Sequence, residues 1–428
     1  MKKIPNLRWY IAGLLAAATA LNYLHRQNLP VAISEIQKNI PITDKQFSDL
    51  QVMFLLAYSL MYAGGGRIMD WLGTRTGYAV MIVFWSAANF ASGLVSTVFG
   101  LGSARFMLGL GEGGGFPGSA KAVSEWFPAK DRSLAFGIFN AGSSVGAVVA
   151  PPLIAAIALS MGWRWVFLIT GVAGFVWAAV WLKLYQWPER HRWITPEERE
   201  LICSSRPQAQ TVKRVSWLSL LKYRQVWGIM SAKLLSDAAW YFFIFWLPKY
   251  LADVRHLNIK QIGYYAWIPY AFAGAGSMIG GWLSSWLLRR NPSIDRSRKI
   301  ALAISAAMMP ASLMIAASPL ALAILFFSMA MFGHQFWSTI IQTLPVDMFP
   351  PRAVGSVAGL QGASGSFGGM LFNLAVGSWL TWYHSYTMVF LVAGLLHPAS
   401  FLLILAIVRR IEPVMDFKAS PAPAAAKS

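Results

Sequence analysis

The chain has 428 residues, of which 56% are hydrophobic, 14% are aromatic and only 12% are charged. So few charged residues could not cover the surface of a soluble protein, and a disordered chain does not carry so many aromatic residues. Its single cysteine, Cys203, excludes a disulfide framework and a cysteine-rich metal site. The formal net charge of +19 would suit a nucleic-acid-binding face, but the basic residues are spread over short loops. The composition therefore predicts a protein that crosses a membrane several times.

Segments of about 20 mostly apolar residues, the length that crosses a bilayer as a helix, recur along the chain. We predict twelve such spans, at residues 8–29, 47–68, 77–95, 99–121, 133–157, 163–187, 225–251, 262–288, 298–317, 319–341, 353–379 and 385–410. The longest polar interruption contains Thr195, Pro196 and Glu198, which are typical of an N-cap, a first-turn proline and a capping-box glutamate.

These segments predict an all-α integral membrane protein with four parts. We expect a six-helix bundle at 1–187, a cytoplasmic linker at 188–224, a second six-helix bundle at 225–411 and a disordered cytoplasmic tail at 412–428.

The distribution of basic residues predicts the orientation of the chain. Most lysines and arginines lie in alternate loops, in the termini and beside them, which is the positive-inside pattern. The opposite loops contain Lys38, Lys45, Arg164, Lys249, Arg255 and Lys260. Both termini should therefore lie on the cytoplasmic side of the membrane.

The two halves of the chain resemble each other. Phe127-Pro128 recurs as Phe349-Pro350, and at the same offset Gly146 falls on Gly368. A second alignment places Gly65-Gly66 on Gly280-Gly281, so spans 2, 4 and 5 correspond to spans 8, 10 and 11. A parallel repeat of six plus six spans resembles the major facilitator superfamily, which implies two pseudo-symmetric bundles.

Glycines within the spans are predicted to be structural. Gly109 to Gly114 fit the pattern G-x-G-x-x-G, but no strand precedes them, so a dinucleotide site is not expected. Small residues of this kind, like the pairs Gly142/Gly146 and Gly365/Gly369, allow helices to approach closely.

The loop after the second span carries Gly66, Asp70, Gly73 and Arg75. This spacing is similar to the superfamily's loop signature, G-x-x-x-D-x-x-G-x-R. The resemblance implies a gating motif in which Asp70 binds the start of the next helix or a loop arginine. The alternative is a tight turn with solvated charges. Ser285 replaces the aspartate in the second half, so that copy cannot form the same lock.

Ionisable residues inside the spans are candidates for function, because each costs several kcal/mol unless it faces a cavity or a partner. His25 and Arg26 lie in span 1, and Arg105 and Glu112 lie seven residues apart on one face of span 4. Span 7 contributes Lys233 and Asp237 at positions i and i+4. Three cations against two anions leave one positive charge that an anionic ligand could neutralise. The alternative is a set of internal ion pairs, Arg26 with Glu112 and Lys233 with Asp237, that only tie helices together.

Several motifs resemble the anion:cation symporter family. They are Tyr23-Leu24-His25-Arg26, Arg105 with the segment 111–117, the segment 124–128 and the segment 139–144. The segment 237–251, followed by Val254-Arg255-His256, is similar to bacterial hexuronate transporters.

This resemblance implies proton-coupled uptake of a sugar acid such as glucuronate or galacturonate. It also implies that Arg26 binds the substrate carboxylate, that Glu112 carries the proton, and that Tyr23 and Tyr58 line the sugar site. Galactonate-type members have an aspartate where this chain has His25. His25 could therefore titrate in transport or simply hydrogen-bond a neighbour.

Further side chains are candidates for substrate binding, although each could instead fill a contact between helices. They are Arg105, Asn140, Ser143, Lys233, Asp237, Trp240, Gln335, Gln361 and Asn373.

The expected partners are a small sugar-acid anion, protons and the lipid bilayer, with no nucleic acid, metal or cofactor, and the expected location is the bacterial cytoplasmic (inner) membrane. We expect a monomer. Another organic anion (an aldonate, aldarate or aromatic acid) and sodium coupling or exchange stay open. A membrane-embedded enzyme is disfavoured, because the chain has no His-Glu-x-x-His or Gly-x-Ser-x-Gly motif. A sensor is disfavoured because no signalling domain is attached.

Overall fold

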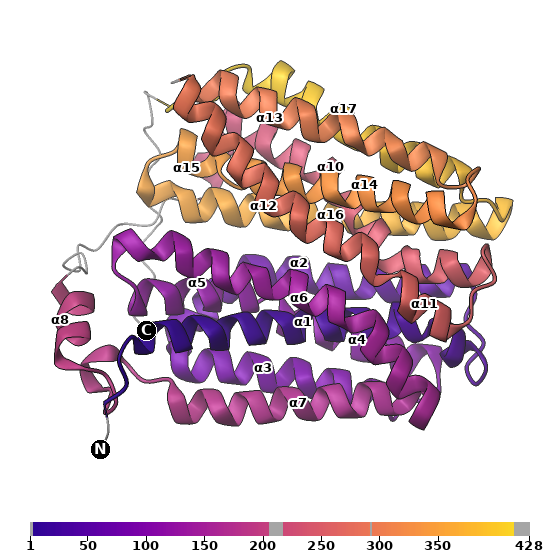
Figure 1. Cartoon of the computed structure of the whole chain (residues 1–428), viewed down its shortest axis with the longest axis horizontal. Helices are drawn as coiled ribbons and strands as arrows, with labels where there is room; N and C mark the ends of the chain where they lie inside the picture. The colour runs from indigo at the N-terminus through magenta and orange to yellow at the C-terminus, as the bar shows by residue number, and fades with distance from the viewer. Residues whose placement is uncertain (1–2, 205–216, 292, 415–428) are drawn as a thin grey trace. The chain divides into compact units, whose positions relative to one another are not determined.

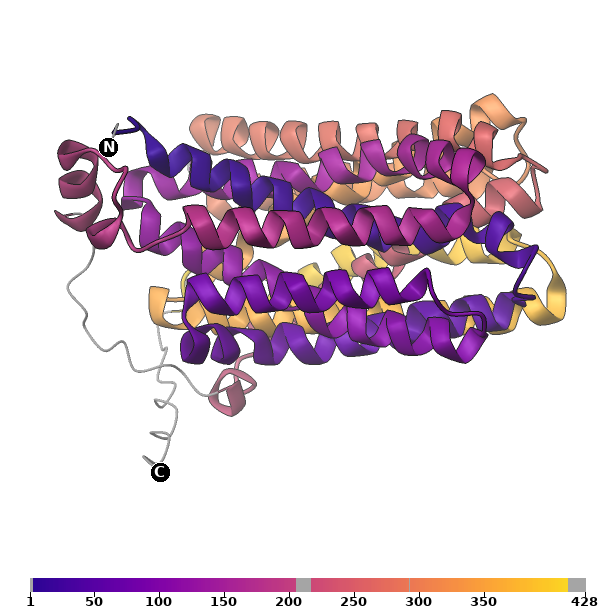
Figure 2. The ribbon, with the colours of Figure 1, turned by 90° about the horizontal axis from the view of Figure 1, so that it is seen from below.

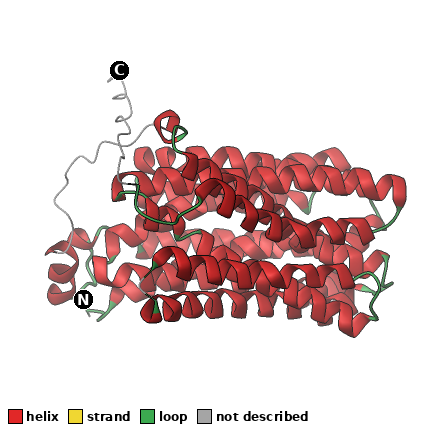
Figure 3. Ribbon diagram, turned by 90° about the horizontal axis from the view of Figure 1, so that it is seen from above, coloured by secondary structure: helices red, strands yellow, loops and turns green. Residues whose placement is uncertain are grey.

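The computed structural model describes residues 3–204, 217–291 and 293–414, and these are built from helices with no β-strand (Figures 1 and 3). The helices before the linker are α1 (Leu7–Gln37), α2 (Asp44–Leu72), α3 (Thr74–Ser92), α4 (Val98–Glu112), α5 (Gly115–Trp126), α6 (Ala129–Met161), α7 (Trp163–Leu184), the 3₁₀ helix η1 (Pro188–Arg190) and α8 (Pro196–Ser204). Those after it are α9 (Trp217–Leu220), α10 (Arg224–Asp253), α11 (Ile259–Tyr265), α12 (Trp267–Arg290), α13 (Ile294–Met308), the 3₁₀ helix η2 (Met309–Met314), α14 (Leu320–Ile341), α15 (Leu344–Met348), α16 (Pro351–Tyr383), α17 (Thr387–Leu403) and the π-helix η3 (Ile404–Val408).

Every predicted span falls on helix, but some spans are interrupted. The span predicted at 99–121 is two helices, α4 and α5, separated at Gly113 and Gly114. Consecutive glycines favour such a break, because glycine costs about 1 kcal/mol relative to alanine inside a helix. Among the described residues, four segments are long and apolar enough to cross a membrane by themselves: Leu134–Met161, Trp163–Leu184, Leu320–Met348 and Thr387–Val408.

The contacts within the chain divide it into two compact units. The first unit contains α1 to α8 together with Phe245–Trp267, which is the end of α10 with α11. The second contains α9, α10 as far as Ile244, and the chain from Ile268 onward. Residues 205–216 of the predicted linker and 415–428 of the predicted tail lie outside the described residues.

Glycines set the helix contacts of the first unit. A Cβ atom on Gly142 would lie 2.1 Å from the Ala16 carbonyl oxygen, and one on Gly146 would lie 2.3 Å from that of Ala20. A Cβ on Gly109 would likewise lie 2.3 Å from the Phe54 carbonyl oxygen. Only glycine permits these approaches, which press α6 onto α1 and α4 onto α2.

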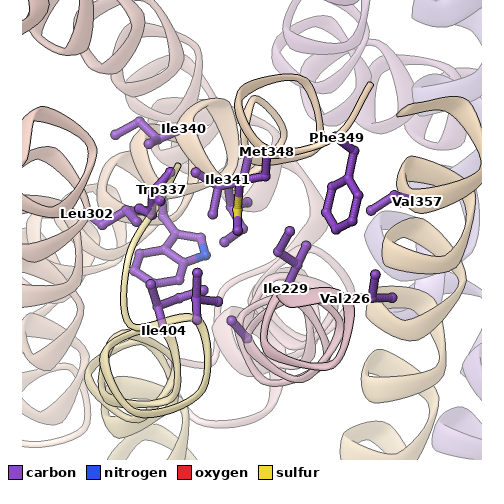
Figure 4. Packing of buried hydrophobic residues seen from close by; sticks show 14 of the residues in the cluster. Val226, Ile229, Leu302, Trp337, Ile340, Ile341, Met348, Phe349, Val357 and Ile404 are labelled. Carbon is purple, nitrogen blue, oxygen red and sulfur yellow. The ribbon is translucent and has the colours of Figure 1, made fainter. Parts of the chain in front are cut away.

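The second unit repeats this arrangement with its own glycines. A Cβ on Gly368 of α16 would lie 2.0 Å from the Leu234 carbonyl oxygen of α10, and one on Gly276 of α12 would lie 2.3 Å from that of Phe332 on α14. The contact of α16 with α10 therefore corresponds to that of α6 with α1, as the internal repeat predicts. Behind it lies a buried apolar core, part of which is seen in Figure 4, where Trp337, Ile229 and Ile404 gather between the helices.

The described part of the linker is fastened to the start of the first helix. Thr195 Oγ1 accepts a hydrogen bond from the backbone N–H of Glu198, at 3.3 Å, as the predicted N-cap requires. The Glu198 carboxylate, however, accepts from the backbone N–H groups of Leu7 and Arg8, at 2.8 and 3.1 Å, and from Arg8 Nη1 at 2.9 Å. Glu198 therefore caps α1 instead of its own helix, and Figure 2 shows α8 beside the start of α1.

Candidate functional site

The centre of the first unit is an ion pair between Arg26 of α1 and Glu112 of α4. Arg26 donates from Nε and Nη2 to Glu112 Oε2, at 3.1 and 3.0 Å. Their side chains are 4% and 0% exposed. The pair joins two helices that are distant in sequence, and such a buried pair is stable only while both partners stay in place.

Aromatic rings hold the guanidinium group in position. The Arg26 Cζ atom lies 4.9 Å from the ring centre of Tyr23 and 4.9 Å from that of Tyr58, with Phe54 at 5.3 Å. Rings at this distance attract a cation through their negative faces. The two tyrosines predicted for the site therefore contact the predicted cation.

Asn22 is a member of this cluster that the sequence analysis did not select. Its Oδ1 accepts from Arg26 Nη2 at 3.1 Å. The signal that could have found it is its position four residues before Arg26, which places both side chains on one face of α1.

A cavity opens beside the ion pair, with an empty volume of about 500 Å³ including the space at its mouth. It brings together six of the predicted residues: Tyr23, Arg26, Tyr58, Glu112, Asn140 and Ser143. The lining also includes residues that were not predicted: Ala18, Thr19, Asn22, Tyr78, Trp85, Gly115, Phe116, Ser119 and Phe139.

Three of these additional residues, Tyr78, Ser119 and Trp85, bring polar atoms to the lining. The hydroxyl groups of Tyr78 and Ser119 lie 2.8 Å apart and hydrogen-bond each other. The indole Nε1 of Trp85 is buried and has no hydrogen-bond partner among the described residues. An indole N–H can only donate, so a ligand with an acceptor atom would satisfy it.

Arg105 lies outside this lining, although it shares α4 with Glu112. The residue is 1% exposed, and its Nη2 donates to Gln51 Oε1 at 2.7 Å. Its Cζ atom is 4.7 Å from the Phe54 ring centre. Within the described part of the chain, no hydrogen-bond partner reaches its Nε and Nη1.

His25 also lies outside the lining. Its ring is 0% exposed, and Nε2 lies 2.8 Å from the backbone carbonyl oxygen of Thr170 on α7. This geometry agrees with the alternative in which His25 simply hydrogen-bonds a neighbouring helix.

The second unit holds the other predicted ion pair. Lys233 Nζ lies 2.9 Å from Asp237 Oδ1, one turn along α10, and 3.4 Å from Ser338 Oγ. Trp240 stacks on His334, with ring centres 4.7 Å apart and an angle of 9° between the planes. The Lys233 and Asp237 side chains are 8% and 11% exposed, so this ion pair is also buried.

The other candidates of the second unit contact the protein backbone. Gln361 Nε2 donates to the Ile341 carbonyl oxygen at 2.9 Å, and Asn373 Nδ2 donates to that of Gly369 at 2.8 Å. Gln335 is half-buried on α14.

The loop motif forms the turn between α2 and α3. Gly73 has a φ of 72°, a value that favours glycine, and Arg75 Nη2 donates to the Leu182 carbonyl oxygen at 2.5 Å. The helical segment includes Gly66 and Asp70, but the Asp70 side chain lies outside the described part of the structure. Among the residues that are described, no group of three or more His, Cys, Asp or Glu side chains could hold a metal ion.

The family model described as "Major Facilitator Superfamily" matches residues 15–373. The hexuronate transporter of Escherichia coli (strain K12) is 35% identical over 384 residues, covering 88% of this chain and 89% of that protein. The galacturonate transporter of Dickeya chrysanthemi is 38% identical over 286 residues, covering 66% of this chain and 83% of that protein. The chain therefore belongs to the major facilitator superfamily.

A solved structure has the same fold. It is a bacterial homolog of the human lysosomal transporter Spinster, in an inward-facing and occupied conformation, with a TM-score of 0.70 at 18% identity over 94% of this chain and 92% of that chain. The prediction of an all-α membrane protein with the major facilitator fold is confirmed.

Proposed function

We propose that this membrane protein is a secondary active transporter that takes up a hexuronate, such as glucuronate or galacturonate, together with a proton by alternating access. We place it in the bacterial cytoplasmic membrane, as a monomer with both termini in the cytoplasm. The relatives named for hexuronate and galacturonate support the substrate class, at 35% and 38% identity.

The observation that carries the proposal is the Arg26–Glu112 ion pair in the wall of a cavity. A hexuronate combines a carboxylate with a ring of hydroxyl groups, and the cavity offers a counterpart to each. Arg26 presents a planar fork of N–H donors that suits a carboxylate. Asn140 and Ser143 of α6 and the two tyrosines offer polar atoms and ring surfaces to the sugar.

Coupling to protons follows from competition between two carboxylates for one cation. When a hexuronate carboxylate binds the Arg26 guanidinium, Glu112 loses its partner. A buried carboxylate without a cation is costly, so Glu112 takes up a proton. One negative charge and one positive charge have then entered together, and the loaded cavity has no added net charge.

Release reverses these steps at the cytoplasmic side. Glu112 gives up its proton, recaptures Arg26 and displaces the substrate. The substrate contacts also include Arg105, Lys233, Asp237, Trp240, Gln335, Gln361 and Asn373 in this proposal, and the loop of Asp70 and Arg75 gates the cytoplasmic side. His25 hydrogen-bonds α7, so Glu112 is the main proton carrier.

The test is uptake of labelled D-galacturonate into proteoliposomes with an imposed pH gradient, an imposed sodium gradient or neither. Accumulation should require the pH gradient, and glucuronate should compete more strongly than galactonate, galactarate or an aromatic acid. Accumulation driven by sodium alone would contradict proton coupling. Competition by galactarate but not by glucuronate would contradict the substrate class.

A matched variant isolates the role of the carboxylate. Glu112→Gln keeps the size of the side chain but cannot exchange a proton, so it should lose gradient-driven accumulation and keep exchange of external for internal substrate. Unimpaired accumulation in this variant would refute the proposed coupling.

A further inference from the structure

Two neighbouring helices of the second unit, α13 and α17, each expose apolar side chains that lead to an arginine. On α13, Arg296 is exposed and lies one turn before Ile300, which is 36% exposed. At the end of α17, in the η3 turn that continues it, Leu405 is 39% exposed and lies four residues before the exposed Arg409. The exposed side chains that continue these faces away from the arginines are Ile304 (42%) and Leu402 (63%).

Two printed contacts bring these arginines to the same end of the unit. Lys299 Nζ donates to the Arg409 carbonyl oxygen, and Asp295 Oδ1 accepts from the Ile411 N–H at 2.8 Å. The start of α13 therefore meets the end of η3, and Figure 1 shows α13 and α17 along one edge of the unit. We call this surface the arginine edge; it consists of Arg296, Ile300, Ile304, Leu402, Leu405, Arg409 and Arg410.

The backbone at Arg409 turns the chain sharply. Its φ is 64°, in the left-handed region that is uncommon for a residue other than glycine. Its N–H donates to the Ile404 carbonyl oxygen at 3.0 Å, and Lys299 holds its own carbonyl oxygen. A strained conformation persists only where the surrounding contacts hold it. This turn keeps Arg409 and Arg410 beside the start of α13.

The arginine edge has an excess of positive charge. The nearby carboxylate of Asp295 is already used, because it pairs with Lys299 at 2.7 Å and caps the Ile411 N–H. Within the described part of the chain, no ion pair joins the three arginines of the edge to a carboxylate. All three are exposed, and the one further acid in this stretch is Glu412. An anion would therefore be attracted here.

The exposed apolar residues indicate what kind of anion fits. In a membrane protein such residues contact acyl chains, and the level at which they give way to arginines is that of the lipid headgroups. The guanidinium fork suits a phosphate group. A phospholipid with net negative charge combines a phosphate and acyl chains in this order.

We propose that the arginine edge is a binding site for an anionic phospholipid. The lipid phosphate binds Arg296, Arg409 and Arg410, and the acyl chains lie along Ile300 and Leu402. The site belongs to the second unit, whereas the Arg26–Glu112 pair belongs to the first, so it does not depend on the proposed function.

The experiment is native mass spectrometry of the purified full-length protein, titrated with phosphatidylglycerol or phosphatidylcholine of the same acyl chains. Each arginine beside an anionic headgroup contributes about fivefold in affinity, so the wild type should bind phosphatidylglycerol at least about tenfold more tightly. The combined variant Arg296→Gln, Arg409→Gln and Arg410→Gln should lose this preference. Equal affinity of the wild type for the two lipids, or an unchanged preference in the variant, would overturn the proposal.

A matched control removes three other exposed arginines, Arg190, Arg192 and Arg224, which lie outside the arginine edge. This control should keep the preference for phosphatidylglycerol. An equal loss in both variants would mean that only total charge matters, and the proposal would fail.

Two further measurements complete the test. Soluble glycerol 3-phosphate should not displace the lipid, because it lacks acyl chains; displacement at equal concentration would show an ordinary phosphate site and not a lipid site. Melting temperatures without lipid show whether the combined variant is folded. If it is not, Arg296→Gln and Arg410→Gln are tested singly, and each should weaken phosphatidylglycerol binding about fivefold without affecting phosphatidylcholine. Unchanged binding in both would equally overturn the proposal.

Discussion

Replacing Arg26 with lysine tests whether the shape of the cation, and not only its charge, binds the substrate. Arg26 directs Nε and Nη2 at a single carboxylate oxygen of Glu112, at 3.1 and 3.0 Å. Its guanidinium carbon lies 4.9 Å from the ring centres of Tyr23 and of Tyr58. A lysine ammonium keeps the charge but cannot present two parallel N–H groups or a planar face to an aromatic ring.

The expected magnitude follows from the loss of one charge-assisted hydrogen bond. Such a bond contributes about 1.5–3 kcal/mol, so Arg26→Lys should raise the Kd for D-galacturonate by roughly 10- to 150-fold. Arg26→Ala should abolish measurable binding. It should also destabilise the protein, because Glu112 would stay buried without its cation, at a cost of about 3–5 kcal/mol.

Isothermal titration of the purified variants measures these effects directly. Arg164→Lys is the control, since Arg164 belongs to the same unit, lies outside the cavity and donates to Ser96 Oγ at 3.2 Å. It should bind like the wild type. Unchanged affinity in Arg26→Lys would show that charge alone suffices, and unchanged affinity in Arg26→Ala would place the anchor elsewhere, with Lys233 as the first candidate.

Three other predictions concern individual contacts. Trp85→Phe should weaken D-galacturonate binding about fivefold, as measured by isothermal titration, because it removes a buried N–H that only a ligand would satisfy. Equal affinity would mean that this N–H does not contact the sugar. Gly142→Ala should lower the melting temperature, at a cost of about 1–3 kcal/mol, because its Cβ would lie 2.1 Å from the Ala16 carbonyl oxygen. Gly137→Ala on the same helix has open space around its Cβ and should leave the melting temperature unchanged. Equal melting temperatures for the two variants would contradict the helix contact. Burial lowers the pKa of His191 below its usual 6.5, so the unfolded segment binds a proton more readily than the folded one. Acid therefore favours local unfolding, and hydrogen exchange over residues 188–204 should accelerate as the pH falls below about 6.5. His191→Gln should remove that acceleration, and a wild-type rate that does not change with acid, after correction for intrinsic exchange, would contradict the assignment.

Local spacing predicted the contacts that lie within one helix. Lys233 and Asp237 are four residues apart, and the 2.9 Å ion pair follows directly from the helical period. The sequence suggested an Arg26–Glu112 ion pair as one possibility but could not predict its geometry, because that geometry depends on how α1 and α4 pack together. That packing is set by glycines such as Gly109, whose partner is a backbone carbonyl on another helix.

Neighbouring residues on α1 show why the rest of the site could not be predicted. His25 drew attention because it can titrate, but it is rotated by about 100° from Arg26 around the helix and faces α7. Asn22 is neutral and drew none, although it shares the face of Arg26. Side-chain chemistry indicates which residue types could act in a site. Whether a given side chain faces the cavity depends on how the neighbouring helices pack.

The hydrogen bonds from Leu7 and Arg8 to Glu198 have a consequence for biosynthesis. The first turn of α1 has backbone N–H groups without partners in its own helix, and the carboxylate that accepts two of them lies about 190 residues later in the chain. Ribosomes release the chain from its N-terminus, so the first helix must enter the bilayer with that end unfinished. A nascent chain that stops before residue 198 keeps those donors exposed to water, and completion of α8 is the step that fastens the beginning of the protein.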